Sequence, residues 1–241
     1  MIKAVLLDLD NTLYDEHTFV KSGFRAVSKA MTRKLDISED DLYQTLWQTF
    51  LKVERNQVFS ETLKHFGVFD ADLIPEMLEA FRNHCPTISV FEDVYCTLIA
   101  LKEKFALGLI TGGKREVQEN KIKALKLDDY FRVVTYAEEY GGKCCPKPFI
   151  VTLQKLQVSA EESVLVDDDP LQSFSVAKDL GLITVRMLKG ENASLRIDDK
   201  RFEPDFEITS LRQLLDIVCC FEKSSVNRID TEGSCQKGLI F

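Results

Sequence analysis

The sequence predicts an α/β protein whose core is a parallel sheet with helices on both faces, carrying an inserted all-helical domain. Three observations support this prediction. An apolar run of strand length opens the chain at 4–7, residues 15–86 show only helical periodicity, and strand and helix patterns alternate from Val90 onward. Alternating patterns of this kind are typical of βαβ units, which build a single parallel, Rossmann-like sheet.

The helical region follows directly after the first strand. Apolar residues recur at three- and four-residue steps from Phe19 to Leu35, as on one face of an amphipathic helix. Ser38 is suited to cap the next helix, because its hydroxyl can accept from a free backbone N–H. Three further helices are expected over residues 38–53, 60–66 and 73–81. The helical domain is therefore predicted at 15–86, between core segments 1–14 and 87–221.

The second half of the chain supplies the remaining strands of the sheet. They are expected at residues 106–110, 133–136, 163–166, 182–185 and 206–208, with helices between them and a last helix at 211–218. The tail from 222 to 241 is polar and lacks periodicity, so we expect it to be flexible.

Composition narrows the possible partners and compartment. The formal net charge of −8 disfavours a nucleic-acid binder, which needs a basic surface. The seven cysteines include two adjacent pairs and no repeated C-x-x-C spacing, so neither a disulfide framework nor a zinc site is indicated. No apolar run is long enough to span a bilayer, and the opening run meets Asp8 too early for a signal peptide. We expect a cytoplasmic protein without nucleic-acid or membrane partners.

Polar side chains stand at the ends of three predicted strands. Asp8 and Asp10 follow the first, Thr111 and two glycines end the second, and three aspartates at 167–169 follow the fourth. Parallel strands place their carboxyl ends at one edge of the sheet, where ligands bind in α/β proteins. Five carboxylates there would repel one another unless a cation compensates, and oxygen ligands suit Mg²⁺. The alternative interpretation is a set of solvated, turn-forming residues.

These motifs resemble those of the haloacid dehalogenase superfamily of hydrolases. The first family motif, Asp-x-Asp-x-Thr, corresponds to residues 8–12; the second, a Thr or Ser ending a strand, to Thr111; and the fourth, an acidic pair, to Asp167 and Asp168. The helical insert is similar to the family's cap domain in its first-class position, and residues 204–211 also resemble this subgroup. The resemblance covers roughly residues 1–220 and implies the phosphatase branch of subfamily I.

The resemblance implies a nucleophile, a residue that acts first as a general acid and then as a general base, and a metal ion. Asp8 would attack phosphorus to form an aspartyl-phosphate. Asp10 would protonate the leaving oxygen and then deprotonate the hydrolytic water. Mg²⁺ would be held by Asp8, the backbone carbonyl of Asp10, and Asp168. Asp167 and Asp169 are left as either water-mediated metal contacts or turn residues.

Thr111, the Gly112 N–H group and a lysine would hold the phosphoryl oxygens in a protein of this kind. The family lysine precedes the helix leading to the fourth strand, and two residues fit. Lys143 keeps the subgroup's spacing to Pro146 and is favoured, whereas Lys147 keeps the Lys-Pro dipeptide but shortens the following helix. Ser173 departs from the family, where many members have an acidic residue or Asn.

The resulting functional prediction is a Mg²⁺-dependent phosphatase for a small phosphorylated metabolite, such as a nucleotide, sugar phosphate or phospho-acid. One alternative is a phosphomutase-type phosphotransferase, and another is a non-catalytic regulatory module that retains the fold. Dehalogenation is disfavoured, because a halide leaving group needs no proton and the dehalogenases of this family lack the second aspartate, present here as Asp10.

Overall fold

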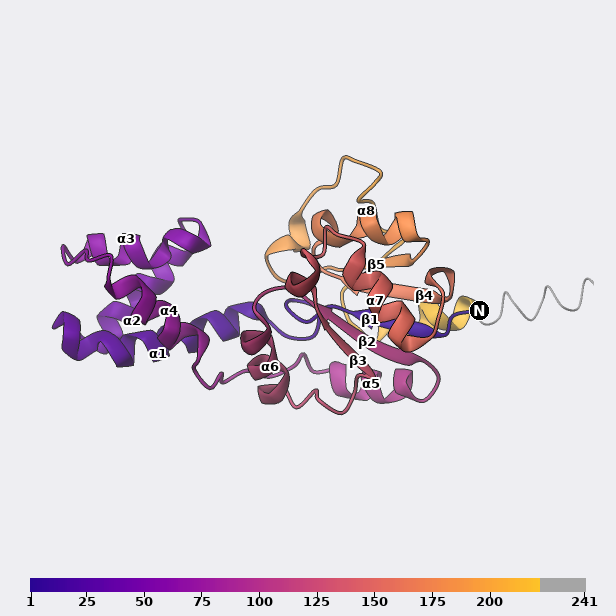
Figure 1. Cartoon of the computed structure of the whole chain (residues 1–241), viewed down its shortest axis with the longest axis horizontal. Helices are drawn as coiled ribbons and strands as arrows, with labels where there is room; N and C mark the ends of the chain where they lie inside the picture. Colours follow the sequence, from indigo (N-terminus) through magenta and orange to yellow (C-terminus); the bar gives the residue numbers. More distant parts are fainter. Residues whose placement is uncertain (222–241) are drawn as a thin grey trace, which may run out of the picture. The chain divides into compact units, whose positions relative to one another are not determined.

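The computed structural model describes residues 1–221, so the predicted flexible tail lies outside the described residues. Six parallel strands form one sheet in the order β3-β2-β1-β4-β5-β6 (Figure 1). The strands are β1 (Ala4–Leu7), β2 (Ala106–Thr111), β3 (Val133–Tyr136), β4 (Ser163–Asp167), β5 (Ile183–Met187) and β6 (Phe206–Ile208). The predicted α/β class and parallel sheet are confirmed.

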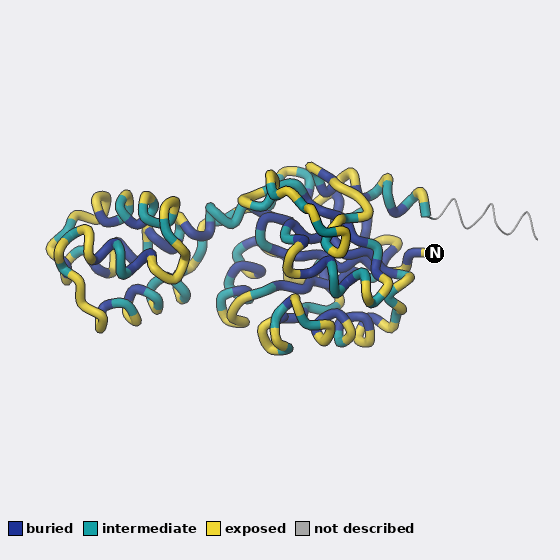
Figure 2. The backbone as a smooth tube through the Cα atoms, turned by 90° about the horizontal axis from the view of Figure 1, so that it is seen from above, coloured by how far each residue is buried: buried dark blue, intermediate teal, exposed yellow. Residues whose placement is uncertain are grey.

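Both faces of the sheet are covered at its centre, which explains why β1 and β2 are apolar without alternation. On one face, Ala4 and Leu6 of β1 pack with residues of α7 (Lys147–Leu156) and α8 (Pro170–Leu180). Successive strand residues point to opposite faces, so Val5 and Leu7 face the other side, where they are equally buried. Figure 2 shows the resulting buried centre of this part of the chain.

The order of the strands creates a switch point beside β1. The chain runs from β1 to β2 and β3 on one side, and then to β4, β5 and β6 on the other. Leu7 pairs with Leu109 of β2 and with Val166 of β4, so β1 lies between them. In open α/β sheets the crevice at such a point, at the carboxyl ends of the strands, is the usual place for a ligand. Asp8 lies one residue beyond β1 at this position.

The helical insert has its own core. It contains α1 (Glu16–Leu35), α2 (Glu39–Phe50), α3 (Val58–His65) and α4 (Leu73–Arg82). Its apolar cluster includes Phe24, Val27 and Leu46. The Ser38 cap is confirmed, since the hydroxyl accepts from the Asp41 N–H group at 3.1 Å.

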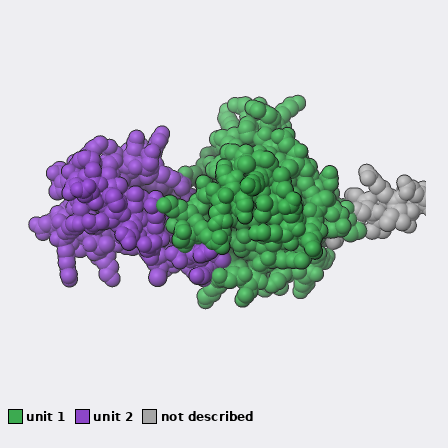
Figure 3. Space-filling view, viewed as in Figure 1, with its two compact units in different colours: residues 1–15, 90–118, 126–241 green, residues 16–89, 119–125 purple. Residues whose placement is uncertain are grey.

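The described chain divides into two compact units, coloured separately in Figure 3. The first contains residues 1–15, 90–118 and the chain from Lys126 onward, and the second contains 16–89 together with 119–125. The second unit therefore takes in most of α6 (Arg115–Ala124), which the sequence pattern assigned to the core. Within residues 1–221, none of the helices is both long and apolar enough to cross a membrane.

One side chain ties the final helix, which spans residues 213–221, to α5 (Val94–Lys102). Asp93, at the start of α5, accepts from Ser210 Oγ at 2.6 Å and from the Arg212 N–H group at 3.0 Å. Partial burial raises the pKa of Asp93, but these hydrogen bonds outweigh it and the pKa is lowered overall.

We expect Asp93→Ala to lower the free energy of unfolding by about 1–2 kcal/mol at pH 7, as measured by urea denaturation. Because the pKa is depressed in the folded state, this contribution is present above the ordinary carboxyl pKa and is lost as the pH falls below it. The difference from wild type should therefore shrink below about pH 4. Asp198→Ala, at an exposed position, is the control and should change stability by less than about 0.5 kcal/mol.

Candidate active site

The end of β1 places Asp8 against β4. The Asp8 N–H group donates to the Val166 carbonyl at 2.9 Å, which continues the ladder one residue past the strand. Because Leu7 pairs with Val166, Asp8 is level with Asp167 of the neighbouring strand. The side chain of Asp8 is buried, with 3% of the residue exposed. The strand pairing therefore brings together carboxylates 159 positions apart in the sequence.

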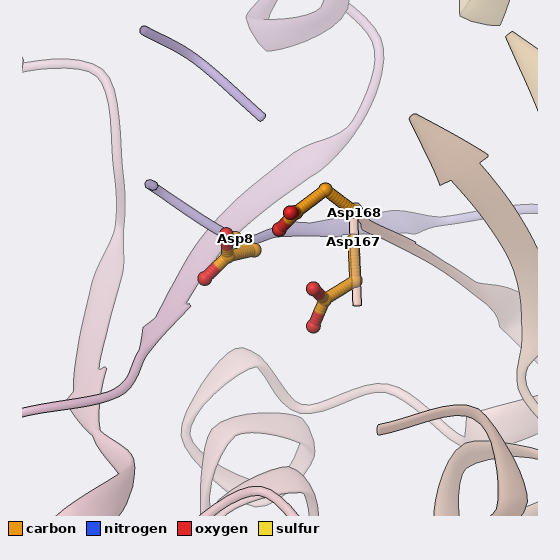
Figure 4. Close-up of side chains that lie close together, drawn as sticks. All are labelled: Asp8, Asp167 and Asp168. Carbon is orange, nitrogen blue, oxygen red and sulfur yellow. The ribbon is translucent and has the colours of Figure 1, made fainter. Parts of the chain in front are cut away.

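Three carboxylates form a buried cluster at this point (Figure 4). One oxygen from each of Asp8, Asp167 and Asp168 lies within 4.8 Å of the others. Burial raises the pKa values of both Asp8 and Asp168, and the neighbouring carboxylates raise them further. Such a group of hard oxygen donors, short of positive charge, fits a divalent cation such as Mg²⁺. The metal site predicted from the sequence used Asp8, the backbone carbonyl of Asp10, and Asp168, and it left Asp167 open.

Lys143 supplies positive charge within this cluster. Its Nζ donates to Asp8 Oδ1 at 2.5 Å and to Asp167 Oδ2 at 2.8 Å. Burial lowers the pKa of the ammonium group, but the attraction of Asp167 and Asp8 outweighs it and the pKa is raised. The loop that carries Lys143 begins with Gly141 and Gly142, whose positive φ angles of 95° and 85° favour glycine.

The other lysine candidate lies elsewhere. Lys147 is the first residue of α7, and its Nζ lies 5.9 Å from the centre of the Tyr140 ring. Between the two lysines that the sequence left open, the geometry therefore favours Lys143 as the one beside Asp8.

Asp10 is held apart from the carboxylate cluster. Its Oδ1 accepts from the Tyr14 hydroxyl, and its Oδ2 accepts from Gln118 Nε2 at 3.4 Å. Gly113 makes room for this contact, because a Cβ atom there would lie 2.9 Å from Gln118 Nε2. Neither Tyr14 nor Gln118 was among the site residues predicted from the sequence. The only available signal was the position of Tyr14 four residues after Asp10.

The remaining predicted residues divide into two groups. Thr111 ends β2 and is fully buried, and Gly112 follows it with open space where a Cβ atom would lie. Asp169 instead caps α8, because its Oδ1 accepts from the Leu171 N–H group at 3.1 Å. Ser173 lies within α8 and donates to the Asp169 carbonyl at 3.3 Å. Of the two acidic residues left open, Asp167 therefore joins the cluster and Asp169 forms a helix cap.

In this arrangement the buried carboxylate of Asp8 lies beside the ammonium group of Lys143. The carboxyl group of Asp10 is separate from it and accepts hydrogen bonds from Tyr14 and Gln118. The negative charge of Asp8 is balanced in part by the buried ammonium group of Lys143. Asp10 lies outside the carboxylate cluster, and its carboxyl group can give or take a proton. This division of roles suits transfer of an anionic group.

Comparisons with known proteins give a consistent picture. Residues 5–187 match the model of the haloacid dehalogenase-like hydrolase family. The chain is 33% identical over 230 residues to a glyceraldehyde 3-phosphate phosphatase of Methanopyrus kandleri, covering 90% of this chain and 97% of the relative.

Two solved structures are similar over nearly the whole described chain. A phosphatase from Thermococcus onnurineus aligns with a TM-score of 0.62 and 28% identity, covering 90% of this chain and 98% of that one. A 2-haloacid dehalogenase from Pseudomonas syringae aligns with a TM-score of 0.65 and 27% identity, covering 92% and 100%. The similar proteins thus include some that are named as phosphatases and one that is named as a haloacid dehalogenase.

Proposed function

Because the chain belongs to the haloacid dehalogenase-like hydrolase family, we propose that it is a magnesium-dependent phosphatase for small phosphomonoesters, acting through a phosphorylated Asp8. The observation that carries this proposal is the buried cluster of Asp8, Asp167 and Asp168 beside Lys143. The phosphatase named among its relatives supports the same reaction class.

The metal site is proposed to use carboxylate oxygens of Asp8 and Asp168, with Asp167 bound directly or through water. The backbone carbonyl of Asp10 remains a further predicted ligand. When bound, Mg²⁺ would offset the repulsion between these carboxylates and an anionic phosphate. The donor set fits this role, since all three side chains are at most 5% exposed and offer only oxygen.

The first step is attack by Asp8 on phosphorus. An Asp8 oxygen forms a bond to phosphorus while the ester oxygen leaves, and the phosphoryl group is transferred to the enzyme. Lys143 remains beside Asp8 and balances the negative charge that accumulates on the phosphoryl oxygens. Thr111 and the Gly112 N–H group are proposed to bind two of these oxygens.

Asp10 carries the proton in both halves of the reaction. It donates a proton to the leaving ester oxygen, and as a carboxylate it then removes a proton from the water that hydrolyses the intermediate. Tyr14 and Gln118 hold its side chain in place. The products are an alcohol and inorganic phosphate, and Asp8 is regenerated.

Asp10 also favours phosphate ester hydrolysis over dehalogenation. Departure of a halide requires no proton donor, so a second aspartate fixed by hydrogen bonds would have no role in that reaction. An alkoxide leaving group, in contrast, requires one. The proposed substrates are therefore small phosphorylated metabolites.

The test is a phosphate-release screen over nucleoside monophosphates, sugar phosphates and phospho-acids, with Mg²⁺ present. We expect release of inorganic phosphate from at least one class, and we expect a chelator to reduce it by at least about 100-fold, with recovery when Mg²⁺ is restored. Release that is equally fast with chelator would contradict the metal requirement. Conversion of the substrate to an isomer without free phosphate would indicate the phosphomutase alternative. Absence of any turnover would indicate the alternative of a non-catalytic regulatory module.

A further inference from the structure

A segment after β5 contacts the proposed metal site and has no role in the mechanism above. It spans residues 188–195, contains a short 3-10 helix (Glu191–Ser194), and is called here the post-β5 loop. Asn192 Nδ2 donates to Asp168 Oδ2 at 3.1 Å. We propose that Asn192 is a positioning residue that holds the Asp168 carboxylate in the orientation needed to bind Mg²⁺. This inference rests on the magnesium site of the proposed function.

The chemistry of the donor suits this role. An amide N–H₂ group can satisfy one carboxylate oxygen and leave the other available to a cation. Because the amide is neutral, it does not cancel the negative charge that attracts the metal. Lys143 differs, since its ammonium neutralises charge at Asp8 and Asp167. Removing a residue that orients a metal ligand in this way typically lowers metal affinity by about 10- to 100-fold.

Arg186 of β5 fixes the loop that carries Asn192. Its Nη2 donates to the backbone carbonyls of Asn192 at 2.7 Å and Leu195 at 2.9 Å, and its Nη1 donates to Glu207 Oε1 at 3.2 Å. Arg186 is only 4% exposed. The guanidinium is planar and rigid, so it holds one carbonyl within the 3-10 helix and one just after it in a fixed relation. The position of Asn192 is therefore set by a buried side chain on the sheet.

Gly190 packs the loop against the first motif, residues 8–12. Its φ of 65° and ψ of −156° belong to a region that is essentially restricted to glycine. A Cβ atom there would lie 2.3 Å from Asn11 Cγ, so only glycine permits this packing. Asn11 lies between Asp10 and Thr12 and is buried. The post-β5 loop is thus attached to the sheet by Arg186 and packed on the first motif by Gly190.

The test compares Mg²⁺ binding to wild type, Asn192→Ala and Ser194→Ala by isothermal titration calorimetry without substrate. Ser194 is exposed and lies in the same 3-10 helix, so it provides a matched control. We expect Asn192→Ala to weaken Mg²⁺ binding by about 10- to 100-fold, and Ser194→Ala to change it less than about twofold. Thermal melting of the metal-free proteins should be alike in all three. Arg186→Lys, which keeps the charge but loses the planar fork, should weaken binding by an intermediate factor.

The outcomes separate this inference from the proposed function. Equal Mg²⁺ affinity in wild type and Asn192→Ala overturns the positioning role alone. Weaker binding in Asn192→Ala without any phosphatase activity in wild type supports the positioning role and overturns the proposed reaction. An absence of Mg²⁺ binding to wild type overturns both. Where activity is present, raising the Mg²⁺ concentration should restore the turnover of Asn192→Ala, and a turnover deficit that persists at saturating Mg²⁺ also contradicts the role.

Discussion

Replacement of Asp8 by asparagine should reduce the rate of phosphate release by about 10⁴-fold or more. The amide has no anionic oxygen to attack phosphorus, so the covalent step cannot occur. Folding should be preserved, because the substitution removes one of three carboxylates within a buried cluster and relieves their repulsion. The measurements are steady-state phosphate release and the thermal melting temperature of the same preparation.

Asp169→Asn is the matched control for this substitution. Asp169 lies two residues beyond β4, but it caps α8 and is not part of the cluster. Its amide variant should keep activity within about tenfold of wild type. Mass spectrometry after acid quenching should find a phosphoryl group on the peptide containing residue 8 in wild type and in Asp169→Asn, but not in Asp8→Asn. An Asp8→Asn enzyme with wild-type turnover would refute the assignment of the nucleophile.

Removal of Lys143 should damage both activity and stability. Lys143→Met keeps the length of the side chain but leaves Asp8 and Asp167 without their buried cation. We expect phosphate release to fall by about 10²- to 10³-fold, the usual cost of losing one group that stabilises the transition-state charge. The metal-free protein should lose about 3–5 kcal/mol of unfolding free energy, because a broken buried ion pair leaves uncompensated charge. Part of this loss should return on addition of Mg²⁺, which binds the folded state.

Lys147→Met separates the two lysines that the sequence left open. Lys147 lies at the start of α7 beside the Tyr140 ring, away from the carboxylates. Its removal should change phosphate release by less than about threefold and stability by less than about 0.5 kcal/mol. The opposite pattern, a severe loss in Lys147→Met and little effect in Lys143→Met, would assign the phosphate-binding role to Lys147.

The strands of the sheet were predictable because local patterns mark them. Three strands have the predicted bounds, at Ala4–Leu7, Val133–Tyr136 and Phe206–Ile208, and the other three differ by one or two residues at one or both ends. The central strands are apolar runs because they are buried on both faces of the sheet, and glycine or aspartate bounds them because these residues form turns. Both features can be read from residues that are close together in the sequence. The assignment of α6 was less predictable. Most of this helix groups with the helical insert, and such grouping depends on contacts between segments that are distant in the sequence.

The sequence by itself determined the α/β class, the order of the motifs and the residue types at the strand ends, since periodicity and turn chemistry are local properties. It could not determine which of two lysines meets Asp8, which of two aspartates joins the cluster, or that Asn192 donates to Asp168. Only the tertiary structure decided these, because each depends on the strand order and on the path of a loop. Lys143 and Asn192 reach the carboxylates through the pairing of β1 with β4 and the anchoring of the post-β5 loop by Arg186.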